Sequence, residues 1–330
     1  MVPFFASKLE KTISALVIIG FLSQLGTAAQ SNVSGFAGVE YFGSSQMTRK
    51  ELAKMISLKP GAAFPSVQRA ADKLSKLLDQ RHLAANVEVV QASDGAIYVA
   101  VDVMDSSMES VPVRNLKEPH HIIVRSEKPF LLLAQLDARL QTLSIEGRPA
   151  SEKIEDGAKV YSDEAANQLA IQIQKFAPAM AGELLSVLDS DPDPHRRKAA
   201  VDILGWAGDI PQMGAKLIES LDDSDPSVRA SVVRYLFSRL SYLPDDFPFP
   251  ALIEGASREL NRPSHQDRSK GLYLLLALAR KDIVFMRQIQ DLDEARVKQL
   301  SEESIVPTIK NPAAELLAIF AKSRKDPVGS

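Results

Sequence analysis

Hydrophobic and polar residues alternate in three short segments of the first third of the chain, at 38–43, 85–91 and 97–103. Alternation with a period of two residues is typical of a strand with one buried face. Between the first two segments, apolar residues recur every three or four positions in 48–58 and 65–80. This spacing indicates two helices that each bury one face. The pattern therefore predicts the order strand, helix, helix, strand, strand.

Local signals agree with these boundaries. Thr48 followed by Glu51 is a capping box at the start of the first helix. The break Lys59-Pro60-Gly61 separates the two helices, and Asp94-Gly95 is a hairpin turn between the last two strands. We expect a three-stranded sheet with both helices on one face, in which strand 97–103 is half-buried.

The order of these elements and a few motifs carry a family resemblance. The motifs are the strand end Phe42-Gly43, the turn Leu58-Lys59-Pro60-Gly61, the step Arg81-His82-Leu83 and the hairpin Asp94-Gly95. With them, residues 36–105 resemble a POTRA domain, the periplasmic module of outer-membrane assembly and two-partner secretion proteins. The resemblance implies a domain that binds extended polypeptide and performs no chemistry.

In that family the function is strand addition, in which an edge strand pairs with an extended client. By analogy, the segment 85–91 is the expected edge, and Val87, Val89 and Gln91 are the expected partner-binding residues. The alternative is that residues 106–130 or the helical half of the chain cover this edge.

Residues 106–160 are expected to be a connector. Three prolines at 112, 119 and 129 interrupt it, one helix is predicted over 130–143, and the polar stretch 151–157 is interpreted as a loop. His120 and His121 suggest a metal site, but adjacent side chains on an extended chain point to opposite sides. We interpret this pair as part of a solvated loop.

The second half, 161–323, contains an internal repeat. Pro194 and Arg197 recur 32 residues later as Pro226 and Arg229, and a weaker third copy contains Arg268. A helix, an Asp-Pro turn and a second helix with an early arginine resemble HEAT repeats of the short bacterial type. The predicted fold class is therefore α+β, a β-α-α-β-β domain followed by an all-α solenoid.

The repeat turns have a physical cause, because Asp caps the second helix and Pro fits its first turn. Arg197 and Arg229 are expected to reach turn carboxylates of neighbouring repeats, such as Asp191 or Asp225. Such a ladder of ion pairs would be structural. Further helices over 282–289, 294–302 and 312–323 are expected to cap the array, and 324–330 is expected to be a tail.

Aromatic residues in the helical half have two interpretations. The turn 242–250 places Phe247 and Phe249 among three prolines. They are candidate partner-binding residues in an exposed contact loop, with a plug of the solenoid core as the alternative. Trp206, the only tryptophan, is interpreted as core packing and not as a ligand platform.

Composition excludes several classes of function. The chain has no cysteine, which excludes disulfides, thiol nucleophiles and cysteine metal sites. Its net charge of −3 provides no basic field for nucleic acid. The motifs of serine hydrolases, zinc proteases and nucleotide-binding loops are absent from the sequence. We therefore expect no catalytic, cofactor-binding or metal-binding residues. An uncharacterised hydrolase or lyase is the remaining alternative, with His120, His121 and His265 as the first residues to test.

The N-terminus has the pattern of a secretory signal. Lys8 and Lys11 precede the apolar run 13–22, and small residues follow at 26–29. This predicts a signal peptide over 1–29, with cleavage after Ala29 and a periplasmic or secreted product. The alternatives are an uncleaved anchor or a buried core helix. No later segment reaches 18 consecutive apolar residues, so no further membrane span is expected.

These patterns predict a non-enzymatic interaction scaffold of the bacterial cell envelope. It would bind an extended protein segment by strand addition at the sheet domain and a second surface through the solenoid. The alternative is a structural component of a fixed envelope or secretion complex.

Overall fold

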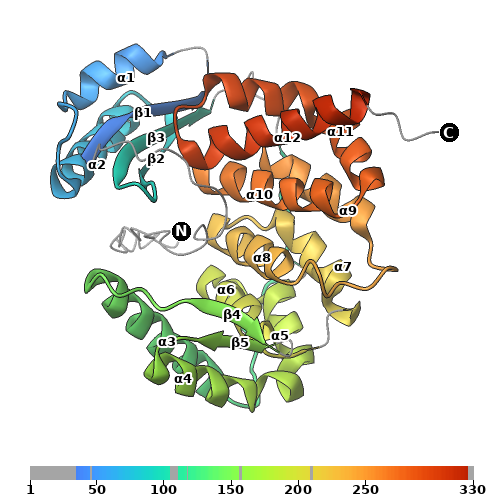
Figure 1. Ribbon diagram of the computed structural model, residues 1–330. Helices are drawn as coiled ribbons and strands as arrows, with labels where there is room; N and C mark the ends of the chain where they lie inside the picture. The colour runs from blue at the N-terminus through green and yellow to red at the C-terminus, as the bar shows by residue number, and fades with distance from the viewer. Residues whose placement is uncertain are drawn as a thin grey trace, which may run out of the picture.

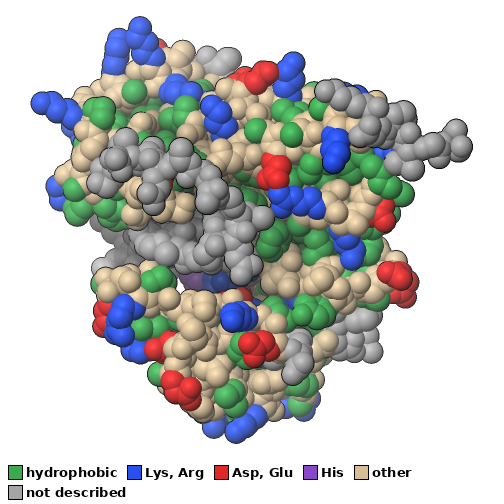
Figure 2. Space-filling model, viewed as in Figure 1, with side chains coloured by type: hydrophobic (Ala, Val, Ile, Leu, Met, Phe, Trp, Pro, Cys, Tyr) green, Lys and Arg blue, Asp and Glu red, His purple; other side chains and the backbone are tan. Residues whose placement is uncertain are grey.

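A computed structural model describes residues 35–44, 47–104, 111–116, 118–155, 158–208 and 211–325. The predicted signal peptide and most of the predicted tail lie outside these residues. The molecule is curved, with the N-terminal sheet domain at one end and a helix-and-hairpin arm at the other (Figure 1). Stacked helices join the two ends, and Figure 2 shows that basic and acidic side chains are spread over both ends on this face.

The sheet domain has the predicted order of elements. These are β1 (Gly35–Gly43), α1 (Arg49–Ile56), α2 (Phe64–Gln80), β2 (Ala84–Gln91) and β3 (Ala96–Met104). The strands form one sheet in the order β1-β3-β2, in which β3 pairs parallel with β1 and antiparallel with β2. The central strand is therefore the last one in sequence, and β2 lies at an edge.

Both faces of this sheet are covered. The predicted capping box of Thr48 and Glu51 is present at the start of α1. On one face, α1 and α2 pack their apolar stripes, including the fully buried Leu52, Val67 and Leu78, against the sheet. The other face packs against the end of the solenoid. Strand β3 is consequently buried along nearly all its length, and not half-buried as its alternation predicts.

The connector contains the predicted helix, α3 (Lys128–Ile145), and one element that was not predicted. The polar stretch after it is not a loop but an antiparallel hairpin of β4 (Glu152–Glu155) and β5 (Ala158–Tyr161). A tertiary contact stabilises this hairpin, because the Trp206 indole Nε1 donates a hydrogen bond to the Lys159 carbonyl at 3.1 Å. Strands of four residues give too short an alternation to be recognised in the sequence.

The remaining helices stack in a series that shares one hydrophobic core with α3 and the hairpin. They are α4 (Glu164–Gln174), α5 (Ala177–Ser190), α6 (Pro194–Leu204), α7 (Pro211–Glu219), the 3-10 turn η1 (Ser220–Asp222), α8 (Pro226–Ser238), α9 (Phe249–Glu259), α10 (His265–Lys281), α11 (Ile283–Glu303) and α12 (Pro307–Lys325). Helices α6, α8 and α10 are consecutive neighbours in the stack and lie between the sheet domain and the helix-and-hairpin arm (Figure 1).

Two predicted boundaries at the C-terminal end were wrong. The segments expected as separate helices over 282–289 and 294–302 form the single helix α11. The last helix begins at Pro307 and contains Pro312 in its interior, whereas Pro312 was predicted to start it. A proline signals a helix start only when it occupies the first turn, and here Pro307 does so. Within the described residues, no helix has the length and apolar character needed to span a bilayer.

Candidate functional site

The outer edge of β2 presents backbone groups that no other described residue pairs. The Ala92 N–H donates to the Ala96 carbonyl at 2.8 Å, and the antiparallel pairing continues without a shift along β2. In such a ladder the residues bonded to the partner strand alternate. The even-numbered residues of β2 therefore direct their N–H and C=O groups to β3. The backbone N–H and C=O groups of Val87, Val89 and Gln91 point to the outer edge.

The three predicted partner-binding residues of β2 differ in their side chains. Val87 and Val89 are half-buried against the helical face of the sheet, whereas Gln91 is exposed. The valines thus offer backbone groups to a partner, and only Gln91 offers a side chain. Binding at these positions stays a prediction.

The opposite edge of the sheet is partly covered by the chain itself. The Phe36 N–H donates to the Ala62 carbonyl at 2.8 Å, and the Gly61 N–H donates to the Phe36 carbonyl at 2.9 Å. The turn between α1 and α2 therefore occupies the start of β1. This leaves β2 as the more open of the two edges.

The repeat arginines form buried ion pairs from one repeat to the next. Arg197 donates from Nε and Nη2 to the Asp223 carboxylate at 3.0 and 2.7 Å. Arg229 pairs in the same way with Asp267. All four side chains are buried. Pro194 and Pro226 occupy the first positions of α6 and α8, as the repeat pattern predicts.

The prediction that Asp191 and Asp225 are the carboxylate partners of this ladder was wrong. Arg197 reaches only the backbone carbonyl of Asp191, at 3.0 Å, because the Asp191 carboxylate accepts from Arg196. Asp225 caps α8 and accepts from the backbone N–H groups of Ser227 and Val228. A capping carboxylate faces its own helix N-terminus, so the arginine of the preceding repeat bonds to Asp223 instead.

The last arginine of the ladder pairs with the sheet domain. Arg268 Nη2 lies 2.6 Å from Asp102 Oδ1 on β3, and each side chain is 1% exposed. The Arg268 guanidinium also lies over the Phe42 ring, 3.9 Å from its centroid. In the two preceding repeats the equivalent arginine bonds to a carboxylate of the next repeat. The sheet domain therefore takes the position of the next repeat in the ladder.

Further contacts tie the sheet domain to the start of α12. The Ile305 N–H donates to Glu40 Oε2 at 2.9 Å. Val306 packs in a small apolar cluster with Val90, Tyr98 and Ala100 of the sheet. The two halves of the chain are thus joined through a buried interface that contains both apolar side chains and an ion pair.

The extended connector lies along the turns of the repeats. The Arg114 N–H donates to the Asp222 carbonyl at 2.6 Å, and its guanidinium bonds to Asp223 at 2.7 Å. Further along, the Ile122 N–H donates to Asp191 Oδ2 at 3.2 Å. The chain's own connector therefore occupies the ridge of repeat turns. No periodic signal in the sequence marks Arg114, because its partners belong to distant repeats.

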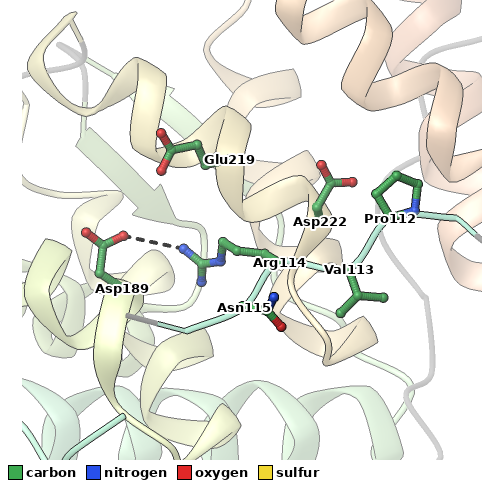
Figure 3. Close-up of a pocket in the computed structure, with 7 residues that line it drawn as sticks. All are labelled: Pro112, Val113, Arg114, Asn115, Asp189, Glu219 and Asp222. Carbon is green, nitrogen blue, oxygen red and sulfur yellow. Dashed lines mark hydrogen bonds and ion pairs between the residues drawn. The ribbon is translucent and has the colours of Figure 1, made fainter. Parts of the chain in front are cut away.

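An open pocket of about 250 Å³ lies where the connector crosses these turns (Figure 3). Its lining includes Arg114, Asp189 and Asp222, and the Arg114 guanidinium points toward Asp189 (Figure 3). Ion pairs already neutralise these carboxylates: Asp189 pairs with Arg114 and Lys216, and Asp222 pairs with Arg258 and Arg262. The described lining of this pocket contains no serine, threonine, lysine or histidine.

Phe247 and Phe249 do not form a contact loop. They are 5% and 4% exposed, and their rings lie 5.3 Å apart within the main core. Gly214 of α7 allows this packing, because a Cβ there would lie 2.6 Å from the Phe247 ring. The prediction that these residues form an exposed partner-binding site was wrong. Both rings fill the core of the solenoid, as the alternative interpretation has it. Trp206 is likewise buried.

The candidate histidines are not brought together. His120 and His121 are exposed on the connector, where His121 Nδ1 lies 3.4 Å from Asp191. His265 is buried at the start of α10 with its Nε2 3.1 Å from the Thr308 hydroxyl. Burial lowers the pKa of His265 to about 3. Among the described residues, no group of three or more histidine and acidic side chains could hold a metal ion.

The junction contains a carboxyl group that makes stability depend on pH. Burial, and secondarily the charge of Asp102, raises the pKa of Glu88 on β2 to about 7. Because the folded state then binds more protons than the unfolded chain between pH 4.5 and 7, this group lowers stability as pH rises through that window. Glu88→Gln keeps an acceptor for the Asn86 amide, which lies 2.5 Å from Glu88 Oε1.

We expect the free energy of unfolding of Glu88→Gln to exceed that of the unaltered protein by an amount that grows from pH 5 to pH 7.5. Urea denaturation at several pH values measures this difference. A constant difference across the range would show that Glu88 titrates as an exposed carboxylate does.

Residues 152–236 match the family model for HEAT repeats. The match extends from β4 to α8 and includes the first two arginines of the ladder. The helical half is therefore a HEAT-like solenoid. Curated proteins and solved structures gave no match. HEAT repeats generally mediate protein–protein interactions, and the chain as a whole has an α+β organisation.

Proposed function

We propose that this protein is a non-enzymatic scaffold of the bacterial cell envelope. Its sheet domain, whose order of elements resembles that of a POTRA domain, would take up an extended segment of a protein partner by strand addition at β2. The inner face of the solenoid, formed by α6, α8 and α10, would contact a second surface of the partner or the same segment further along.

The outward backbone groups of Val87, Val89 and Gln91 carry this proposal. An edge strand with unpaired N–H and C=O groups is a template for another strand. The start of the other edge is occupied by Ala62 and Gly61, so among the described residues β2 is the more open edge for a partner strand. The charged, apolar and small segments of residues 1–29 support a periplasmic or secreted location.

A fixed component of an envelope complex is the second candidate. The buried pair of Arg268 and Asp102 favours it, because a rigid junction holds two binding surfaces at a constant distance. A photoreactive residue at the exposed position Gln91, followed by mass spectrometry in cells, separates the candidates. A spread of crosslinked proteins supports a client binder, and a single recurrent partner supports a fixed complex.

A proline at position 89 tests strand addition directly. Val89→Pro removes an outward N–H and leaves the ladder to β3 intact, since proline is tolerated where the N–H faces away from the sheet. Val89→Ala is the matched control, because it loses the same side chain and keeps the N–H. We expect Val89→Pro to lose most of the crosslinks from Gln91, and Val89→Ala to retain them.

Equal crosslinking by both variants would contradict strand addition. Circular dichroism of each variant verifies that the sheet domain remains folded.

A further inference from the structure

A row of cations crosses the inner face of the solenoid. Lys198 of α6 and Arg234 of α8 both bond to Asp202, at 2.7 and 2.6 Å. Lys270 follows on α10, and its Nζ donates to the Ala230 carbonyl at 3.3 Å. The three helices are neighbours, so the row continues from repeat to repeat.

The positive charge of this row is only partly neutralised. Asp202 serves both Lys198 and Arg234, and Asp137 of α3 lies close enough to Lys198 to influence its pKa. Arg234 remains 35% exposed, and its Nε has no hydrogen-bond partner. No described carboxylate lies within ion-pair distance of Lys270. Burial and the nearby Arg234 lower the pKa of Lys270 to about 7, so its ammonium form is about half populated at pH 7, and a partner's carboxylate beside it would favour that charged form.

The end of this row lies near the β2 edge. Asp267 of α10 acts electrostatically on Lys270 and also on Glu88 of β2. Strand β2 lies on the side of the sheet domain that faces the helix-and-hairpin arm, and α10 and α8 lie between the two (Figure 1). Arg268, two residues before Lys270 on α10, bonds to Asp102 of β3, the strand that pairs with β2, so a segment bound at β2 lies within reach of Lys270.

We infer that the inner face of the solenoid binds an acidic stretch of the same extended segment that adds to β2. Carboxylates at alternate positions of this segment would pair with Lys270 and Arg234. Such pairs are partly shielded from water in a concave surface, where charge complementarity selects partners. This inference rests on the proposed strand addition and specifies the chemistry of the partner.

Two labelled peptides separate the inference from the proposed function. Both have about 20 residues, which span up to ~66 Å when extended. One alternates Val with Glu, and the other alternates Val with Gln. Binding of the Val–Gln peptide, measured by fluorescence anisotropy with the full chain, tests strand addition alone. The difference between the two peptides tests the cationic row.

We expect the Val–Glu peptide to bind more tightly at low salt and to lose this advantage as salt is raised. Lys270→Gln keeps a donor for the Ala230 carbonyl. We expect it to lower the affinity for the Val–Glu peptide about fivefold and to leave the affinity for the Val–Gln peptide unchanged. Arg234→Gln should have a similar effect, because Lys198 still pairs with Asp202. Lys298→Gln, at an exposed position of α11, is the control and should bind both peptides normally.

Equal affinity for the two peptides, or equal weakening of both by Lys270→Gln, would overturn the inference while strand addition stands. If neither peptide binds, or if Val89→Pro binds both as well as Val89→Ala does, the proposed function fails and the inference fails with it.

Discussion

Replacing Arg268 by Met is expected to lower the free energy of unfolding by about 3–5 kcal/mol. The change leaves Asp102 buried without its cationic partner, and burial already raises the pKa of that carboxyl group. It also removes the guanidinium that packs over Phe42. Methionine retains most of the apolar stem of the arginine side chain, so the loss of stability comes mainly from the broken ion pair.

Urea denaturation measures this loss, and Arg280→Met provides the control. Arg280 pairs with Glu315 at the surface, where both side chains are more than a third exposed. Removing such a pair costs about 0–1 kcal/mol. We expect the Arg268 variant to recover part of its stability as pH falls, because protonation of Asp102 removes the unpaired charge. If the two variants are equally stable, the ladder does not hold the sheet domain to the solenoid.

Asp223→Ala is expected to have an effect of similar size within the solenoid, about 3–5 kcal/mol. Asp223 is fully buried and accepts from Arg197, Arg114 and the Asp225 N–H. Burial alone would raise the pKa of Asp223, but these hydrogen bonds hold it below its ordinary value. The substitution leaves two arginines without this carboxylate, so it weakens both the repeat ladder and the attachment of the connector.

The neighbouring Asp225 supplies the control for that experiment. Asp225→Ala removes only the N-cap of α8 and should cost about 1 kcal/mol. Limited proteolysis adds a second measurement, because loss of the Arg114 contact should expose residues 111–125 to cleavage in the Asp223 variant. Equal stability and equal protection of both variants would contradict a structural role for the ladder.

The candidate surfaces could be predicted from the sequence to different extents. The boundaries of β2 follow from local alternation and the hairpin turn at Asp94-Gly95, both of which depend on nearby residues, whereas its place at the edge of the sheet was expected only from the POTRA resemblance. The interpretation of Phe247 and Phe249 was wrong because proline-rich turns look alike whether a neighbouring helix covers them or not. Gly214, which makes room for Phe247, lies in another repeat.

The sequence by itself determined the order of elements in the sheet domain and the period of the repeats. Both depend on short-range regularities, the alternation of a strand and the Asp-Pro caps of helices, whose free energy comes from contacts within a few residues. Only the tertiary structure decided that β3 is covered on both faces and that the connector follows the repeat turns. It alone decided that Arg268 pairs with Asp102, because an ion pair between residues so far apart in sequence forms only once packing has excluded water from both charges.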